Sequence, residues 1–238
     1  MRIVILSDSL GRPRPDLADE EKTRITDVYG SILAEKLGKP FIVDLCYVES
    51  IDTEDALLWS QRMVAFREPD IIIYHLGIND CTPRVFRKNA NPFIFYPLFR
   101  KLTGDICLKA ISRYRYYLTR ALRRTHVPLA DYKTNLQKMR AEVIKYSPHC
   151  SFFAISIAKA SQKIAVRNYE LNENIEKYNN ALCELFGDRY IDVNLMLPND
   201  QLLISDGVHL TKIAHRLLAD ELADRIGKAI NTPHNGEK

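Results

Sequence analysis

The sequence contains no long hydrophobic run. Its longest uninterrupted apolar stretches, such as residues 3–6 and 71–74, are only a few residues long, whereas a helix that crosses a bilayer needs about 20 apolar residues. The start of the chain does not resemble a secretory signal, because Ser7 and Asp8 end the first apolar stretch. We therefore expect a cytoplasmic protein with no membrane-spanning segment.

Cysteine pairs and nucleotide-binding loops are also missing. The five cysteines are widely spaced, no C-x-x-C pair occurs, and no Cys/His spacing resembles a zinc site. The G-x-G-x-x-G and G-x-x-x-x-G-K-[ST] loops are absent, and so is the G-x-S-x-G motif of α/β-hydrolases. We therefore expect reduced thiols rather than a disulfide framework, and neither a metal nor an organic cofactor.

The chain does contain enough apolar sequence for a packed core. Of its 238 residues, 46% are hydrophobic and 27% are charged, which suits a single domain over residues 1–238. The charge is uneven, because residues 84–126 hold eleven basic residues and one acid, whereas the remainder holds 23 basic and 29 acidic residues. We expect a mildly acidic body that carries one strongly basic segment, rich in aromatic residues.

The apolar pattern predicts alternating strands and helices. Continuous runs rich in β-branched residues are typical of strands covered on both faces, and they occur at residues 2–6, 41–45, 70–76, 151–157 and 189–193. A 3.6-residue period predicts helices between the strands, at residues 25–37, 131–146, 171–185 and 213–226, with another at 107–124 inside the basic segment. Gly38, Gly187 and Gly227 are expected at or near three helix ends. The fold class is therefore α/β, a three-layer α/β/α sandwich around a mainly parallel five-stranded sheet, with residues 84–126 inserted after the third strand.

Polar side chains follow three of the predicted strands. Ser9 comes after the first strand, Asn79 after the third, and Asp206 and His209 after the fifth. Because ligands of parallel sheets bind outside the carboxyl ends of the strands, we expect these side chains to meet. A serine hydroxyl becomes nucleophilic when an imidazole takes its proton, and a carboxylate must orient that imidazole. The sequence therefore predicts a serine-nucleophile site in which Asn79 and the Ser9 N–H can stabilise an oxyanion.

The same segments resemble a known family. Ser7-Asp8-Ser9-Leu10, Gly77-Ile78-Asn79-Asp80 and Asp206-Gly207-Val208-His209 are similar to blocks I, III and V of the SGNH/GDSL hydrolases. The resemblance implies a flavodoxin-like sandwich and a serine esterase. It also implies roles for four residues: Ser9 as nucleophile, His209 as base, Asp206 as its partner and Asn79 as oxyanion donor. We interpret Asp8 and Asp80 as structural residues that bond nearby backbone amides.

Block II departs from the pattern of that family. The family has a glycine there, whose backbone N–H completes the oxyanion hole, but residues 48–53 contain no glycine. Ser50 or Ile51 aligns with that position, and either can offer an N–H. A β-branched isoleucine does not adopt a positive φ cheaply. We expect an oxyanion hole made from Ser9, Asn79 and the backbone of Ser50 or Ile51.

Each motif also has a purely structural interpretation. Ser9 alone could cap a helix, and Asn79 and Asp206 alone could be turn residues. The basic segment could be a solvated lid packed by its aromatic residues, a lid that binds an anionic substrate, or a surface for anionic lipids. Nucleic-acid binding ranks last, because no nucleic-acid motif is present.

We predict a serine esterase that hydrolyses an acyl ester through an acyl-enzyme on Ser9. An O-acetyl group on a carbohydrate or glycolipid is the favoured example. Two alternatives stay open: an acyltransferase that uses the same residues, and a non-catalytic binding protein on the same fold. The sequence assigns no further substrate-binding residues.

Overall fold

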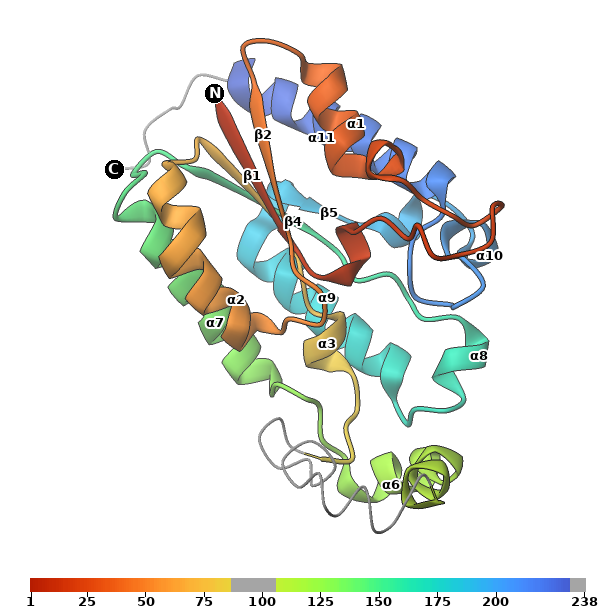
Figure 1. The fold of residues 1–238 in the computed structure, drawn as a ribbon. Coiled ribbons are helices and arrows are strands. Elements are labelled where there is room, and N and C mark those ends of the chain that lie inside the picture. The colour runs from red at the N-terminus through yellow and green to blue at the C-terminus, as the bar shows by residue number, and fades with distance from the viewer. Residues whose placement is uncertain (87–105, 232–238) are drawn as a thin grey trace.

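The computed structural model describes residues 1–86 and 106–231, and a parallel five-stranded sheet lies at its centre (Figure 1). The strands are β1 (Arg2–Ser7), β2 (Ile42–Tyr47), β3 (Ile71–His75), β4 (Ser151–Ile155) and β5 (Tyr190–Ile191). Their order in the sheet is β2-β1-β3-β4-β5, which is the flavodoxin-like order. Ser7 of β1 pairs with His75 of β3, so these two strands end level with each other.

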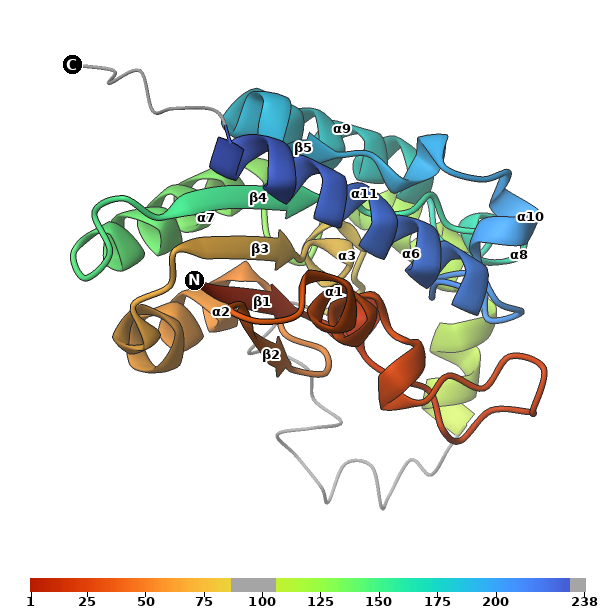
Figure 2. The same ribbon diagram turned by 90° about the horizontal axis from the view of Figure 1, so that it is seen from above.

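Helices cover both faces of the sheet and complete the predicted three layers (Figure 2). One face carries α1 (Tyr29–Leu37) and α11 (Lys212–Asn231), and the other carries α2 (Thr53–Trp59), α7 (Leu129–Ile144) and α9 (Leu171–Phe186). Ile3 and Ile5 enter the core on the first face, whereas Val4 and Leu6 enter the core on the second. Because alternate side chains point to opposite faces, a strand buried on both sides reads as one continuous apolar run.

Shorter elements connect these layers. The short helices are α3 (Ile78–Cys81), α6 (Arg115–Leu122), α8 (Gln162–Ala165) and α10 (Asn199–Leu202). Single turns of other helix types occur at Ser9–Gly11, Ile25–Asp27, Ser60–Val64, Ala65–Arg67, Gly187–Arg189 and Val193–Leu195. Residues 87–105 of the basic segment lie outside the described residues, so a lid role for that segment stays a prediction.

Two predicted helix ends are confirmed and one is wrong. Gly38 and Gly187 follow α1 and α9 with φ of +58° and +52°, and their N–H groups donate to carbonyls of the preceding turn. The last helix does not end near Gly227 but continues to Asn231. The reason is that Ile226 and Ala229 still pack against the core, so the amphipathic pattern continues past the glycine.

Some predicted boundaries shift for local reasons. The strand predicted at residues 189–193 stops at Ile191, because the Asp192 side chain accepts from Asn194 N and caps a 3-10 turn. The helix predicted from residue 25 begins at Tyr29, after a separate 3-10 turn. The helix predicted over residues 107–124 is interrupted by a turn at Tyr114.

The expectations about disulfides and membrane-spanning helices can be compared with the described part of the chain. All five thiols are free in the described structure, and two of them, Cys46 and Cys81, are buried. No helix within residues 1–86 and 106–231 is long and apolar enough to span a bilayer.

Candidate active site

The carboxyl ends of β1 and β3 bring two of the predicted residues to one edge of the sheet. Ser9 opens a single 3-10 turn two residues after β1, and Asn79 lies in α3, directly after β3 and Gly77. Gly77 has a φ of +129°, a conformation that allows the chain to leave the sheet sharply. A side chain at Gly77 would also collide with Ile157 and Tyr132.

Ser9, His209 and Asp206 form one chain of hydrogen bonds. The Nε2 atom of His209 lies 3.1 Å from Ser9 Oγ, and its Nδ1 atom lies 2.6 Å from Asp206 Oδ2. The second oxygen of Asp206 accepts from the backbone N–H groups of Val208 and His209, at 2.9 and 3.0 Å. A proton on Nδ1 donated to the carboxylate leaves Nε2 unprotonated, the form in which it can accept the serine proton.

The environment of Asp206 keeps its carboxylate ionised. Burial opposes ionisation, but the hydrogen bonds from the His209 ring and from the His209 and Val208 amides outweigh it and lower the pKa to about 2. The carboxylate therefore stays charged at any pH at which a histidine can act as a base.

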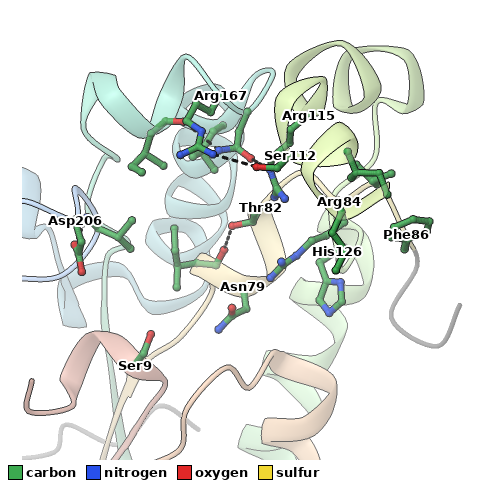
Figure 3. A pocket seen from close by; sticks show the side chains of 18 of the residues that line it. Ser9, Asn79, Thr82, Arg84, Phe86, Ser112, Arg115, His126, Arg167 and Asp206 are labelled. Atoms are coloured by element: carbon green, nitrogen blue, oxygen red, sulfur yellow. Dashed lines mark hydrogen bonds between the residues drawn. The ribbon is translucent and has the colours of Figure 1, made fainter. Parts of the chain in front are cut away.

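One amide hydrogen of Asn79 is bonded, and the other has no partner among the described residues. Its Nδ2 atom donates to the carbonyl oxygen of Ile51 at 2.9 Å, and a carboxamide nitrogen has two hydrogens. Asn79 and Ser9 lie on the wall of the same pocket (Figure 3). The Ser9 N–H is at the start of a helical turn, where no intrahelical acceptor exists. Both donors are therefore available to a ligand in the pocket.

The loop aligned with block II turns at Ser50. Ser50 has a φ of +59°, whereas Ile51 has no positive φ and is buried. The steric objection to a left-handed isoleucine therefore does not arise, because the serine takes that conformation. The choice between the Ser50 and Ile51 N–H as a third oxyanion donor stays a prediction.

Two buried carboxyl groups support the loops around the site. Asp8 accepts from Leu10 N at 2.9 Å, and Asp80 accepts from the N–H and hydroxyl of Thr53 at 2.9 and 2.6 Å. These bonds to nearby amides agree with the structural role predicted for both. Burial raises the pKa of Asp8 to about 8, and burial raises the pKa of Asp80 to about 6 despite the bonds from Thr53.

A pocket of about 850 Å³ opens beside Ser9 (Figure 3). Its wall includes Asn79, Asp206 and His209, together with a group of basic side chains, Arg84, Arg115, His126 and Arg167. Among residues 1–86 and 106–231, no three His, Cys, Asp or Glu side chains form a cluster suited to a metal ion.

Two arginines at the site were not identified from the sequence. Arg14 Nη2 lies 2.9 Å from His209 Nδ1 and also contacts Nε2, although the two residues are far apart in sequence and Arg14 belongs to no motif. Arg167 follows α8, outside the basic segment, and enters the pocket because residues 167–169 bond Ser112, Arg115 and Thr119. The uneven charge distribution pointed to Arg84 and Arg115 but carried no signal for these two.

Comparison with known proteins agrees with the geometry. The model of the GDSL-like lipase/acylhydrolase family matches residues 47–222, a range that contains Asn79, Asp206 and His209 but begins after Ser9. A comparison with curated protein sequences finds no match.

Solved structures share the fold at low sequence identity. A lipase/acylhydrolase from Enterococcus faecalis is 16% identical, with a TM-score of 0.63 over 96% of this chain and 96% of that chain. The aryl esterase of M. smegmatis is 17% identical, with a TM-score of 0.61 over 95% and 98% of the two chains. A carbohydrate acetylesterase from Sinorhizobium meliloti is 13% identical, with a TM-score of 0.60 over 96% and 99%. Because the family match covers most of the sequence, the chain belongs to the GDSL-like lipase/acylhydrolase family and is a carboxylic ester hydrolase.

Proposed function

We propose that the enzyme cleaves its ester through an acyl group bound covalently to Ser9. The observation that carries this proposal is the hydrogen-bond chain from Ser9 Oγ through His209 to Asp206, with distances of 3.1 and 2.6 Å. Ser9 Oγ attacks the carbonyl carbon while His209 Nε2 accepts the hydroxyl proton. The tetrahedral intermediate then breaks its bond to the leaving alcohol, and His209 gives that alcohol its proton.

A water molecule completes the cycle. It attacks the acyl carbon, gives a proton to His209 Nε2 and releases the carboxylic acid, and His209 returns the proton to Ser9 Oγ. The oxyanion of each tetrahedral intermediate would accept from the Ser9 N–H, from Asn79 Nδ2 and from the N–H of Ser50 or Ile51. Asp206 keeps the imidazole oriented in both steps.

The substrate we favour is an O-acetyl ester of a carbohydrate. The likeness to a carbohydrate acetylesterase supports this class, and the pocket of about 850 Å³ falls in the size range of small-molecule sites. A short acyl group and a sugar-sized alcohol would both fit such a volume.

The test is an ester panel combined with a serine-reactive phosphonate. Wild-type protein should release acid from short-chain esters and gain the phosphonate mass on Ser9. Ser9→Ala should lose both reactions, with turnover lower by roughly 10⁴-fold or more, and should keep the wild-type circular dichroism spectrum.

A matched serine gives the control. Ser205 lies in the same loop as Asp206, but its Oγ bonds Glu21 rather than His209. Ser205→Ala should therefore keep turnover and labelling. Equal labelling of wild type and Ser9→Ala, or full turnover by Ser9→Ala, would remove Ser9 as the nucleophile.

A further inference from the structure

Three arginines from distant parts of the chain face the pocket that contains Ser9. Arg84 follows α3, Arg115 begins α6 and Arg167 follows α8. In Figure 3, Arg115 and Arg167 lie on the wall opposite Ser9, and Arg84 lies between them and Asn79. A ligand whose carbonyl carbon sits at Ser9 would therefore extend toward guanidinium groups.

No carboxylate of the described residues neutralises the charge of these arginines. None of the three forms an ion pair with a described Asp or Glu within 4 Å. Asp206 is engaged by His209, and Asp52, which attracts Arg84 at longer range, lies 3.2 Å from His126 Nε2. Residues 87–105 contain a single acid, Asp105, against four basic residues, so they cannot neutralise three arginines.

Neutral acceptors hold two of the arginines in place. Arg115 donates from Nε to Asn168 Oδ1 at 2.5 Å and from Nη2 to the carbonyl of Pro83 at 3.1 Å. Arg167 makes one long bond, from Nη2 to Ser112 Oγ at 3.4 Å. Arg84 Nε is buried and has no hydrogen-bond partner within the described structure. Donor groups therefore remain for a ligand.

The cluster is electrostatically costly without an anion. Burial lowers the pKa of Arg84, and burial together with the nearby charges of Arg84 and Arg167 lowers the pKa of Arg115. Guanidinium groups stay protonated in proteins, so the repulsion persists. Planar guanidinium groups bind phosphate, sulfate and carboxylate oxygens in pairs, and an anion at this point would relieve the repulsion.

We infer that the substrate is an ester whose alcohol or acyl part carries a phosphate, sulfate or carboxylate group, bound by Arg84, Arg115 and Arg167 while its carbonyl carbon lies at Ser9. This inference rests on the proposed function. It places the anion-binding cluster inside the catalytic pocket rather than on the basic segment as a whole, because Arg167 lies outside that segment.

The first test compares three acetyl esters that differ in one group. The acetyl esters of glycerol, glycerol phosphate and glycerate are neutral, phosphorylated and carboxylated, and acetate release measures turnover of each. We expect kcat/KM for at least one anionic ester to exceed that of the neutral ester about 10-fold or more. Equal values for all three esters would overturn the inference.

Arginine variants then show which side chains cause the preference for an anionic ester. Arg84→Gln and Arg167→Gln should each lower the ratio of anionic to neutral kcat/KM by about 10- to 100-fold, the usual effect of one charge-assisted hydrogen bond. Arg216→Gln is the matched control, because Arg216 lies exposed on α11, away from the pocket, and its ratio should match wild type. A ratio unchanged in both pocket variants would also overturn the inference.

A binding measurement separates this inference from the proposed function. Inorganic phosphate and sulfate should raise the melting temperature of Ser9→Ala, and Arg84→Gln in the same background should abolish the rise. If wild type hydrolyses no ester but the rise is seen, the proposed function fails and the anion site stands. If wild type hydrolyses all three esters equally and no rise is seen, the anion site fails and the proposed function stands.

Discussion

Ser50 and Ile51 lie where we align the glycine of the family pattern, and they differ in conformation and burial. A left-handed conformation costs a non-glycine residue roughly 1–2 kcal/mol, and Ser50 takes it at φ +59°. Ile51 keeps its side chain in the core and offers its carbonyl oxygen to Asn79. The loop thus positions Asn79, the proposed oxyanion donor, through the carbonyl oxygen of Ile51.

Asn79→Ala tests that donor. Removing the carboxamide should lower kcat/KM by about 100- to 1000-fold, because the developing oxyanion loses one hydrogen bond. Loss of the bond to Ile51 should lower the free energy of unfolding by only about 1 kcal/mol. Steady-state kinetics on a short-chain ester and urea unfolding measure the two effects.

A second substitution separates the donor from the shape of the side chain. Asn79→Asp has nearly the same shape but lacks the two amide hydrogens, so it should lose a similar amount of activity. If either variant keeps more than a third of wild-type kcat/KM, Asn79 is a turn residue and the oxyanion is bound elsewhere.

The loop between α10 and α11 is a tightly bonded unit. Leu203 and Leu210 form an antiparallel bridge, Ile204 N donates to the carbonyl of His209, and Gly207 N donates to the carbonyl of Ile204. Gly207 has a φ of +75°, and its carbonyl accepts from Ser161 N. The loop therefore fixes His209 relative to the sheet through several backbone bonds.

Gly207→Ala should disrupt this unit. A Cβ atom there would lie 1.9 Å from Ser161 Oγ and 2.8 Å from Ser161 Cβ, and the left-handed backbone would cost about 1–2 kcal/mol more. We expect at least a 10-fold lower kcat and a lower melting temperature. The double variant Gly207→Ala/Ser161→Gly should recover part of both, because it removes the collision with Ser161 and leaves the backbone strain and a 3.1 Å contact with Ile164.

Gly227→Ala is the matched control for that substitution. Gly227 lies inside α11, and no described atom outside its own helical turns lies within 4 Å of an added Cβ. Alanine should stabilise the helix by about 0.5–1 kcal/mol and leave turnover unchanged. Equal effects of the two glycine substitutions would show that the contact with Ser161 is unimportant.

Two buried histidines and a buried carboxyl group have shifted pKa values. Burial lowers the pKa of His75 to about 3 and of His215 to about 4, and burial raises the pKa of Asp8 to about 8. Tyr29 connects the histidines, because its hydroxyl lies 3.3 Å from His75 Nδ1 and its ring stacks on His215. All three side chains are neutral in the folded protein at pH 7.

These groups predict how stability depends on pH. Below pH 6.5 the unfolded chain binds protons that folded His75 and His215 do not bind, so these two histidines lower stability in acid. The protons that folded Asp8 and Asp80 keep oppose this loss. Above the unfolded pKa of about 3.9, folded Asp8 keeps a proton that the unfolded chain releases, so stability falls as pH rises toward 8. Between pH 6.5 and 8 the histidines are neutral in both the folded and the unfolded chain, so only Asp8 contributes. As the pH rises over this range, Asp8 should lower the free energy of unfolding by up to about 2 kcal/mol.

Asp8→Asn should remove this decline, because asparagine imitates the neutral acid and can still accept from Leu10 N. Urea unfolding of both proteins at pH 6.5, 7.25 and 8 provides the measurement. A variant that retains the wild-type slope would show that another group releases the proton.

The strands and the principal site residues could be predicted because they have local signals. An apolar run covered on both faces is recognisable within a few residues, and a polar residue directly after it must lie at the sheet edge. Boundaries were less predictable where a side chain competes with regular structure, as Asp192 does at the end of β5. The single-domain organisation, the cytoplasmic location and the catalytic roles of the site residues stay predictions.

Sequence pattern established the α/β class, the strand-end positions of Ser9, Asn79 and His209, and the excess of positive charge after β3. The folded arrangement alone established that Arg167 joins Arg84 and Arg115, that Arg14 contacts His209, and that Ser50 takes the left-handed turn. The physical reason is the distance along the chain over which each signal acts. The apolar period and the capping residues reflect interactions between residues that are close in sequence. Which distant side chains meet, and how deeply their charges are buried, depends on strand order and on the packing of the helices.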